Sequence, residues 1–116
     1  MEHKKVYDLE ERTYLFAKNI RLLIQKLPTT ISNIEDGKQL VRSSGSVAAN
    51  YIEANEKLGV KDFKFRLKIA RKEAKESLLW IKLLNDLNPK FEDDLKTLSK
   101  EAEELRKILS AIINKS

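Results

Sequence analysis

The sequence predicts an all-α protein, an antiparallel up-down-up-down four-helix bundle that forms one domain over residues 1–116. Composition favours this fold, because three glycines and two prolines in 116 residues are too few for the turns of an all-β protein. Apolar residues also recur at alternating spacings of three and four, which is the period of one buried helix face. Finally, only short segments separate these periodic runs, and short connections force neighbouring helices to run antiparallel.

Local signals place the ends of the four helices. Asp8 begins a capping-box spacing that opens the first helix, and Pro28 ends it. Ser32 repeats this spacing at the second helix, which Gly59 follows as a left-handed cap. Pro89 is typical of the first turn of a helix and opens the last one. We therefore expect helices at about residues 8–27, 33–58, 61–87 and 89–114.

Each predicted helix has one line of residues that faces the other helices. Such a line is buried in a bundle, since each helix turns only part of its surface inward. In the first two helices the lines are Leu9, Phe16, Ile20, Leu23 and Leu27, and Leu40, Ser44, Val47, Tyr51, Ala54 and Leu58. In the last two they are Phe63, Leu67, Ala70, Ala74, Ser77, Ile81 and Leu84, and Phe91, Leu95, Leu98, Ala102, Leu105, Leu109 and Ile112.

The composition excludes several classes of function. The absence of cysteine leaves no disulfide, thiolate nucleophile or cysteine-based metal site. Because the only histidine is His3, neither a Ser-His-Asp triad nor the Glu-x-x-His pairs of a di-iron bundle can be assembled. We expect no catalytic site and no metal or other cofactor. The longest apolar run is residues 78–81, and residues 1–5 lack the apolar core of a signal peptide, so we expect a cytoplasmic protein.

Positive charge is concentrated in the third helix. The net charge is +5, and residues 60–89 contain eight Lys and Arg against four Asp and Glu. Six of these cations fall within an arc of about 80° on the helix and form the basic strip: Lys61, Lys64, Lys68, Arg71, Lys75 and Lys82. Such a strip suits an anionic partner, RNA or DNA first, and it has no motif that reads bases. The alternative is that the strip is only solvated surface.

The third helix also carries a second apolar face, away from its inward line. Its members are Phe65, Ile69, Leu79, Trp80 and Leu83, followed by Leu87. A single four-helix bundle has difficulty burying two faces of one helix, so this face predicts contact with a second copy of the chain. The alternative is one broad stripe in the core of a single copy.

The second helix contains an unusual run of small and polar residues. A glycine inside a helix costs roughly 1 kcal/mol relative to alanine, so Gly45 predicts close approach of another helix, matched by Ala70, Ala74 and Ser77. A polar line beside it, Arg42, Ser46, Asn50 and Glu53, predicts either a buried hydrogen-bond network or an ordinary solvated flank. If the line is buried, Glu73 and Glu76 are the expected counter-ions of Arg42.

Several segments resemble one known family. They are Arg42-Ser-Ser-Gly-Ser-Val-Ala-Ala-Asn-Tyr-Ile-Glu-Ala54, Asp62-Phe63, residues 67–76 and residues 80–84. The chain is similar over nearly its whole length to the four-helix-bundle proteins encoded in intervening sequences of 23S ribosomal RNA genes. It departs from them at Ala54, where many members have glycine. The resemblance implies a closed ring of five copies with no catalytic site. It extends to the accessory protein of diversity-generating retroelements, which engages a reverse transcriptase and nucleic acid.

We therefore expect a non-enzymatic homo-oligomer, a pentamer by resemblance, that binds RNA or DNA through the basic strip with little sequence selectivity. The alternative is a protein-protein adaptor or assembly factor, for example for a reverse transcriptase, without nucleic-acid binding of its own. A bundle with no ligand is the third possibility.

Overall fold

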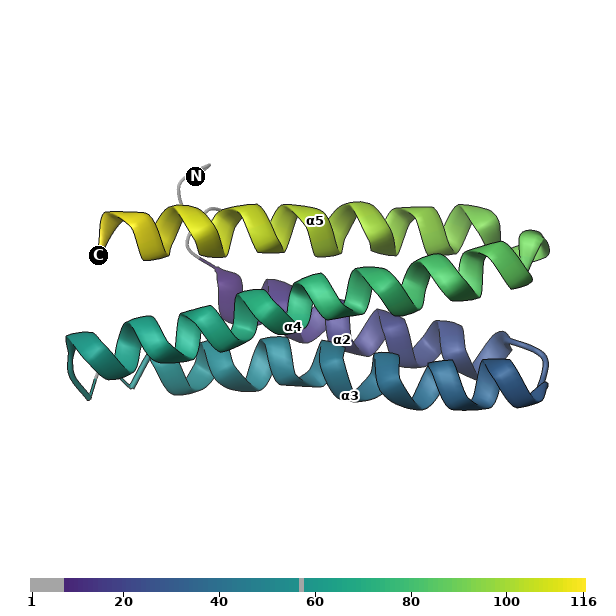
Figure 1. Cartoon of the computed structure of the whole chain (residues 1–116), viewed down its shortest axis with the longest axis horizontal. Coiled ribbons are helices and arrows are strands. Elements are labelled where there is room, and N and C mark those ends of the chain that lie inside the picture. Colours follow the sequence, from purple (N-terminus) through teal and green to yellow (C-terminus); the bar gives the residue numbers. More distant parts are fainter. Residues whose placement is uncertain (1–7, 57) are drawn as a thin grey trace.

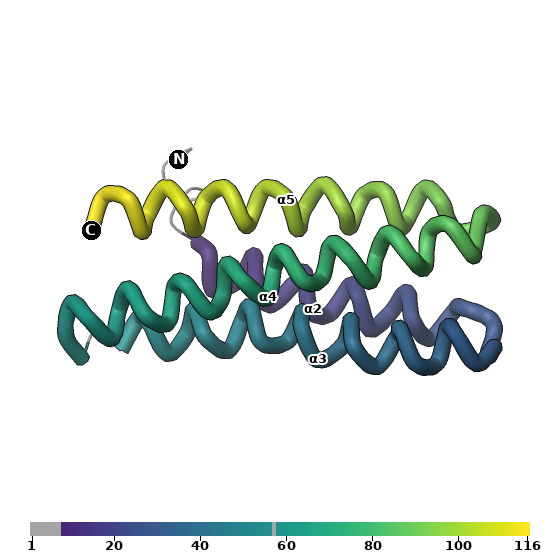
Figure 2. The backbone as a smooth tube through the Cα atoms, viewed as in Figure 1, coloured from purple at the N-terminus to yellow at the C-terminus, as the bar shows by residue number. Residues whose placement is uncertain are grey.

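The computed structural model describes residues 8–56 and 58–116, and these residues fold into long helices with no strand among them. The elements are α2 (Leu9–Lys26), α3 (Ile31–Ala54), α4 (Val60–Leu87), the short 3-10 helix η1 (Pro89–Phe91) and α5 (Glu92–Lys115). The chain passes up and down along one long axis, so consecutive long helices are antiparallel (Figures 1 and 2). The predicted all-α four-helix bundle is confirmed.

Neighbours in the bundle follow the order of the chain. α3 packs between α2 and α4, while α5 packs between α4 and α2, so α2 and α4 are diagonally opposite (Figure 1). The outward surfaces of α2 and α4 therefore point away from each other. We call the end that holds Pro28 and Pro89 the proline end. The other end, where Leu9, Tyr51, Phe63 and Ile112 line a common groove, is the terminal end.

The structure corrects the predicted ends of the second helix. α3 begins at Ile31, because Thr30 rather than Ser32 is its N-cap: the Thr30 hydroxyl accepts a hydrogen bond from the Asn33 amide at 3.1 Å. It ends at Ala54 instead of residue 58, so Leu58 lies outside the helix and is 78% exposed. Its place in the predicted core line was wrong.

Gly59 also has a different role from the predicted one. It does not cap α3 but precedes α4 with φ +147°, a backbone conformation that side-chain-bearing residues rarely adopt. This conformation lets the chain turn from the end of α3 into α4 within a few residues. The start of the last helix differs as well: Pro89 opens η1, and α5 begins only at Glu92.

The predicted inward lines largely form the core. Most of their residues are buried, while Tyr51, Phe63 and Phe91 pack half-buried against the core. At the end of α5 the buried residue is Ile113 rather than Ile112, which is half-buried. The periodic pattern therefore identified the core except at helix ends.

Two polar pairs that the periodicity does not indicate lie inside the bundle. The side-chain amides of Asn33 and Asn88 donate to each other, both at 2.8 Å, near the proline end. Midway along the bundle, the hydroxyl oxygens of Ser43 and Ser77 are 2.8 Å apart. A buried polar group is costly without a partner, so these pairs favour one axial position of α3 relative to α4 and its connection to α5.

The structure places Gly45 on the α2 side of α3, not against α4. A Cβ atom built there would lie 3.0 Å from Nη2 of Arg21, whose side chain crosses from α2 and donates to the Val41 carbonyl at 3.2 Å. The predicted match with Ala70, Ala74 and Ser77 was wrong, and Ser43 is the residue of this run that meets Ser77.

Two glycine substitutions are expected to have opposite effects on stability. Gly45→Ala should raise the free energy of unfolding by about 0.5–1 kcal/mol, because the flexible end of Arg21 can move and alanine favours the helix. Gly59→Ala should lower it by about 1–3 kcal/mol, because of the strained backbone at φ +147°. Urea unfolding followed by circular dichroism at one protein concentration measures both. A loss on Gly45→Ala would show that the Arg21 contacts outweigh helix propensity.

Candidate nucleic-acid and assembly surfaces

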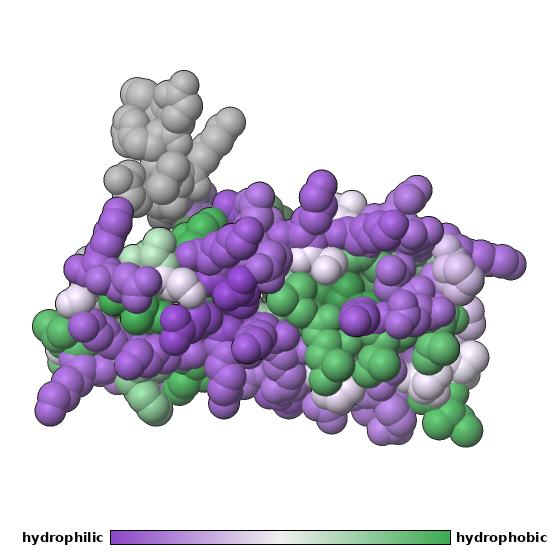
Figure 3. Space-filling view, turned by 45° about the horizontal axis from the view of Figure 1, so that its top comes forward, coloured by the Kyte–Doolittle hydropathy of each residue, from purple (hydrophilic) through white to green (hydrophobic). Residues whose placement is uncertain are grey.

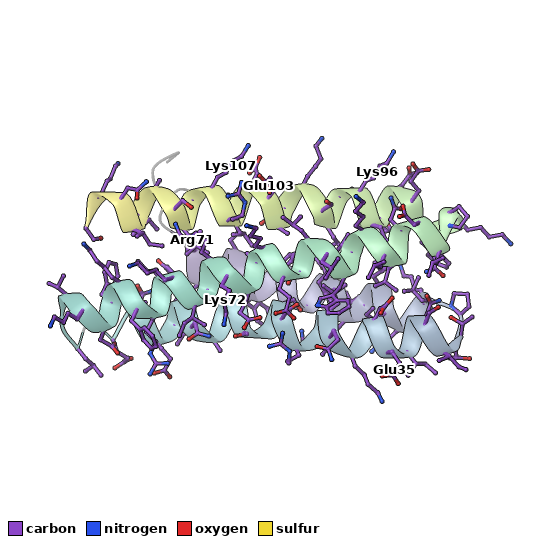
Figure 4. The ribbon with its side chains drawn as sticks, viewed as in Figure 1. Glu35, Arg71, Lys72, Lys96, Glu103 and Lys107 are labelled. Atoms are coloured by element: carbon purple, nitrogen blue, oxygen red, sulfur yellow. The ribbon has the colours of Figure 1, made fainter. Side chains whose placement is uncertain are left out.

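The basic strip lies along α4 on the side next to α5. Lys61, Lys68, Lys75 and Lys82 are exposed, and Lys64 and Arg71 are half-buried. Arg71 points toward α5 (Figure 4) and donates to the Ser110 hydroxyl at 3.3 Å. From the first to the last of the six residues the strip extends about 32 Å, at a helical rise of 1.5 Å per residue.

Acidic groups do not neutralise the strip within one copy. Among the described residues, no carboxylate lies within 4.0 Å of any of its six cationic groups. The carboxylates of α4 face cations outside the strip instead: Asp62 lies 3.7 Å from Arg66, and Glu76 pairs with Arg42. The charge of the strip is therefore open to an external anion.

The second apolar face of α4 remains largely in water in a single copy. Phe65, Leu79 and Leu83 are 57%, 51% and 37% exposed, while Ile69 and Trp80 are half-buried. On the face drawn in Figure 3, apolar side chains gather in the half toward the proline end and hydrophilic ones in the other half. The alternative of one broad core stripe is wrong for the three exposed residues, whereas contact with a second copy stays a prediction.

The structure brings only part of the predicted polar line together. Arg42 of α3 donates to Glu76, and its Nη2 lies 3.3 Å from Oε1 of Glu73. The indole of Trp80 also donates to Glu76, at 3.0 Å. The bond from Trp80, together with that from Arg42, holds the pKa of Glu76 below its usual range, and the two carboxylates raise the pKa of Arg42.

The rest of that line is separate from this cluster. The Asn50 amide donates to the Ser46 hydroxyl at 3.0 Å within α3, and Glu53 is exposed without an ion pair among the described residues. Within the cluster itself, Glu73 is nearly buried, with 8% of its side chain exposed, and no residue that the structure describes donates a hydrogen bond of good geometry to its Oε1. In the described part of the chain, one carboxylate oxygen of the cluster therefore lacks a donor.

A further ion-pair cluster, which the periodicity did not indicate, joins α2 to α5. Nε of Arg12 lies 2.7 Å from Oε2 of Glu101, and its Nη2 lies 2.6 Å from Oε1 of Glu104. These two carboxylates raise the pKa of Arg12. The spacing of Glu101 and Glu104 on one face of α5 is the only trace of this contact in the sequence.

The described residues hold neither a cluster of candidate metal ligands nor a helix suited to cross a membrane. No group of three or more His, Cys, Asp or Glu in residues 8–56 and 58–116 is arranged to hold a metal ion, and His3 lies outside these residues. In the same part of the chain, no helix has the length and apolar character required to cross a membrane.

Comparisons with known proteins agree with this architecture. A family model described as "23S rRNA-intervening sequence protein" matches residues 5–111. The chain is also similar to a solved structure of a protein of unknown function from the S23 ribosomal protein family of Bacteroides thetaiotaomicron, with 28% sequence identity and a TM-score of 0.80. That similarity covers 98% of this chain and 99% of the other. No match was found among curated proteins.

Proposed function

Because this chain belongs to the 23S rRNA-intervening sequence protein family, we propose that it is a non-enzymatic helical scaffold that associates with copies of itself and binds RNA or DNA through the basic strip. The ring of five copies that the family resemblance implies is part of this proposal. The observation that carries nucleic-acid binding is the basic strip itself, six cationic side chains on one helix edge without a carboxylate partner among the described residues.

The chemistry of the strip favours the phosphate backbone over the bases. Lysine and arginine on a straight helix edge contact phosphates without reading sequence. If all six cations contact phosphates, the logarithm of the binding constant should fall with the logarithm of salt concentration at a slope of about −4 to −5. Binding should vary little between RNA sequences of equal length.

Neutralising four residues of the strip tests this proposal. The variant Lys64→Gln, Lys68→Gln, Arg71→Gln and Lys75→Gln should lose the salt-sensitive mobility shift of an RNA of mixed sequence, because most of the phosphate contacts are removed. Its subunit number in light scattering should stay unchanged, since the apolar face of α4 is left intact.

A matched variant controls for net charge. Lys38→Gln, Lys90→Gln, Lys96→Gln and Lys100→Gln remove the same charge outside the strip and should leave RNA binding nearly intact. Equal binding by the wild-type protein and the strip variant would show that the strip is only solvated surface. Absence of RNA or DNA binding by the wild-type protein would favour the adaptor function, with a protein such as a reverse transcriptase as the partner.

A further inference from the structure

We infer that the exposed ring of Phe65 is a stacking platform for an unpaired base, and that the nucleic acid bound along the basic strip is therefore single-stranded. This inference deepens the proposed function and rests on its nucleic-acid binding. It assigns Phe65 to the nucleic acid and leaves Leu79 and Leu83 as the exposed residues of the predicted contact between copies.

The first support is the position of Phe65 beside the strip. Lys61 lies four residues before it and Lys68 three residues after it, so each lysine is about one helical turn from the ring. At about 100° per residue, the ring stands roughly 40–60° around α4 from these two lysines. Arg71, at the other edge of the strip, points toward α5 (Figure 4). The ring therefore borders the strip on the side away from α5.

The second support is that Phe65 is set apart from the exposed leucines of the same helix. Leu79 follows it by fourteen residues, about 21 Å along α4. Lys72 stands halfway between them on the same edge, with 70% of its side chain exposed. Figure 3 shows the same division between a hydrophilic half and an apolar half toward the proline end. A ring among ammonium groups suits a ligand that offers both a flat π-surface and negative charge, as a nucleic-acid strand does.

The third support is that a face of the ring is open. Phe65 is 57% exposed. The Arg66 guanidinium, whose Cζ lies 5.8 Å from the ring centroid, can cover only one of the two faces. Stacking on an aromatic ring accepts every base, because each base has a π-face. A platform at Phe65 therefore agrees with the low sequence selectivity of the proposed function.

Charge around the ring favours the phosphates of the strand. Residues 61–75 contain seven Lys and Arg against two Asp and Glu. Each of these two carboxylates already faces an arginine. Asp62 lies 3.7 Å from Arg66, and the nearly buried Glu73 lies 3.3 Å from Arg42. A base stacked on the ring thus leaves its flanking phosphates among cations.

The shape of the strip selects a single strand over a duplex. Its first five members occupy one straight helix edge of about 21 Å, with neighbours three or four residues apart. Each strand of a duplex winds once in about 35 Å, so over this length it makes more than half a turn and leaves a straight edge. A single strand can straighten along the whole edge. In a duplex the faces of the bases are also covered by their neighbours, so the ring has no base to stack on.

Replacing the ring by an aliphatic side chain tests the platform. We expect Phe65→Leu to weaken the binding of an oligothymidine of about 12 nucleotides about tenfold, because no ring is left for a base to stack on. Binding of a DNA duplex of the same length should change by less than about twofold, because the phosphate contacts remain. The dependence of the binding constant on salt concentration should also be unchanged, since no charge is altered. Fluorescence anisotropy of end-labelled probes measures all three effects.

A strand without bases and a second aromatic residue provide the controls. An abasic oligodeoxynucleotide of the same length should bind the wild-type protein about tenfold more weakly than oligothymidine, and Phe65→Leu should not weaken it further. Tyr14→Leu is the matched variant, because Tyr14 is 53% exposed and lies on α2, diagonally opposite α4. It should leave the binding of every probe unchanged. Circular dichroism checks that both variants fold.

The outcomes separate this inference from the proposed function. Equal, salt-sensitive binding of all three probes by the wild-type protein would support phosphate binding by the strip but overturn the platform. Unchanged binding of oligothymidine by Phe65→Leu, or an equal loss in Tyr14→Leu, would overturn it as well. A changed subunit number of Phe65→Leu in light scattering would place the ring between copies, against the inference. A wild-type protein that binds none of the probes removes the proposed nucleic-acid binding itself.

Discussion

Leu83→Glu is expected to convert the assembled protein into a folded single copy. Leu83 belongs to the outward apolar face of α4 and is 37% exposed in one copy, so the carboxylate can remain in water when the chain is alone. In an assembly the same carboxylate would be buried among apolar side chains without a partner. We expect the dissociation constant to rise by about a thousandfold or more, which corresponds to roughly 4 kcal/mol.

Light scattering at micromolar concentration, with circular dichroism as the check on folding, measures this effect. Leu58→Glu is the matched control, because Leu58 is 78% exposed and lies outside the α4 face. The control should keep the subunit number of the wild-type protein. If Leu83→Glu assembled as the wild-type protein does, the outward face of α4 would not be the contact between copies.

Asn88→Ala is expected to lower the free energy of unfolding by about 3 kcal/mol. The Asn88 amide donates to Asn33 and to the Leu84 carbonyl, both at 2.8 Å, and its oxygen accepts from Asn33 at 2.8 Å. Removing it leaves buried groups without partners, each at a cost of about 1–3 kcal/mol. Urea unfolding at one protein concentration measures the loss.

A double-mutant cycle and a control sharpen this test. The loss of unfolding free energy in the double variant Asn33→Ala and Asn88→Ala should be smaller than the sum of the two single losses. In the double variant neither side-chain amide is left buried without its hydrogen-bond partner. Asn85→Ala is the control, since the Asn85 amide oxygen has no hydrogen-bond partner in residues 8–56 and 58–116 to lose. Additive losses would contradict a coupled pair.

Much of the fold followed from local patterns in the chain. The Asp8 cap was predicted correctly, and its carboxylate accepts from the Glu11 amide at 3.3 Å. The buried lines were right through the helix interiors and failed at Leu58, where the helix had already ended. A helix end is decided by competing side-chain hydrogen bonds, such as Thr30 against Ser32, and the periodicity carries no information about that competition.

The candidate surfaces were predictable to different degrees. The basic strip needed only the helical spacing of six residues, and the contact of Arg42 with Glu73 and Glu76 was among the expected ones. The contact of Gly45 with Arg21 was not, because it depends on which neighbour that side of α3 meets. Ser46, Asn50 and Glu53 share a helix edge with Arg42 but lie too far around or along α3 to join its cluster.

The sequence by itself determined the number of helices, their inward faces and the placement of the cationic edge, because each depends on spacing within one helix. Only the tertiary structure decided which residues meet across helices, such as the Asn33–Asn88 and Ser43–Ser77 pairs. The physical reason is that one helix can slide along or rotate against another without any change in the spacing of its apolar residues. Packing and buried hydrogen bonds select one such position, and these act only once the helices are assembled.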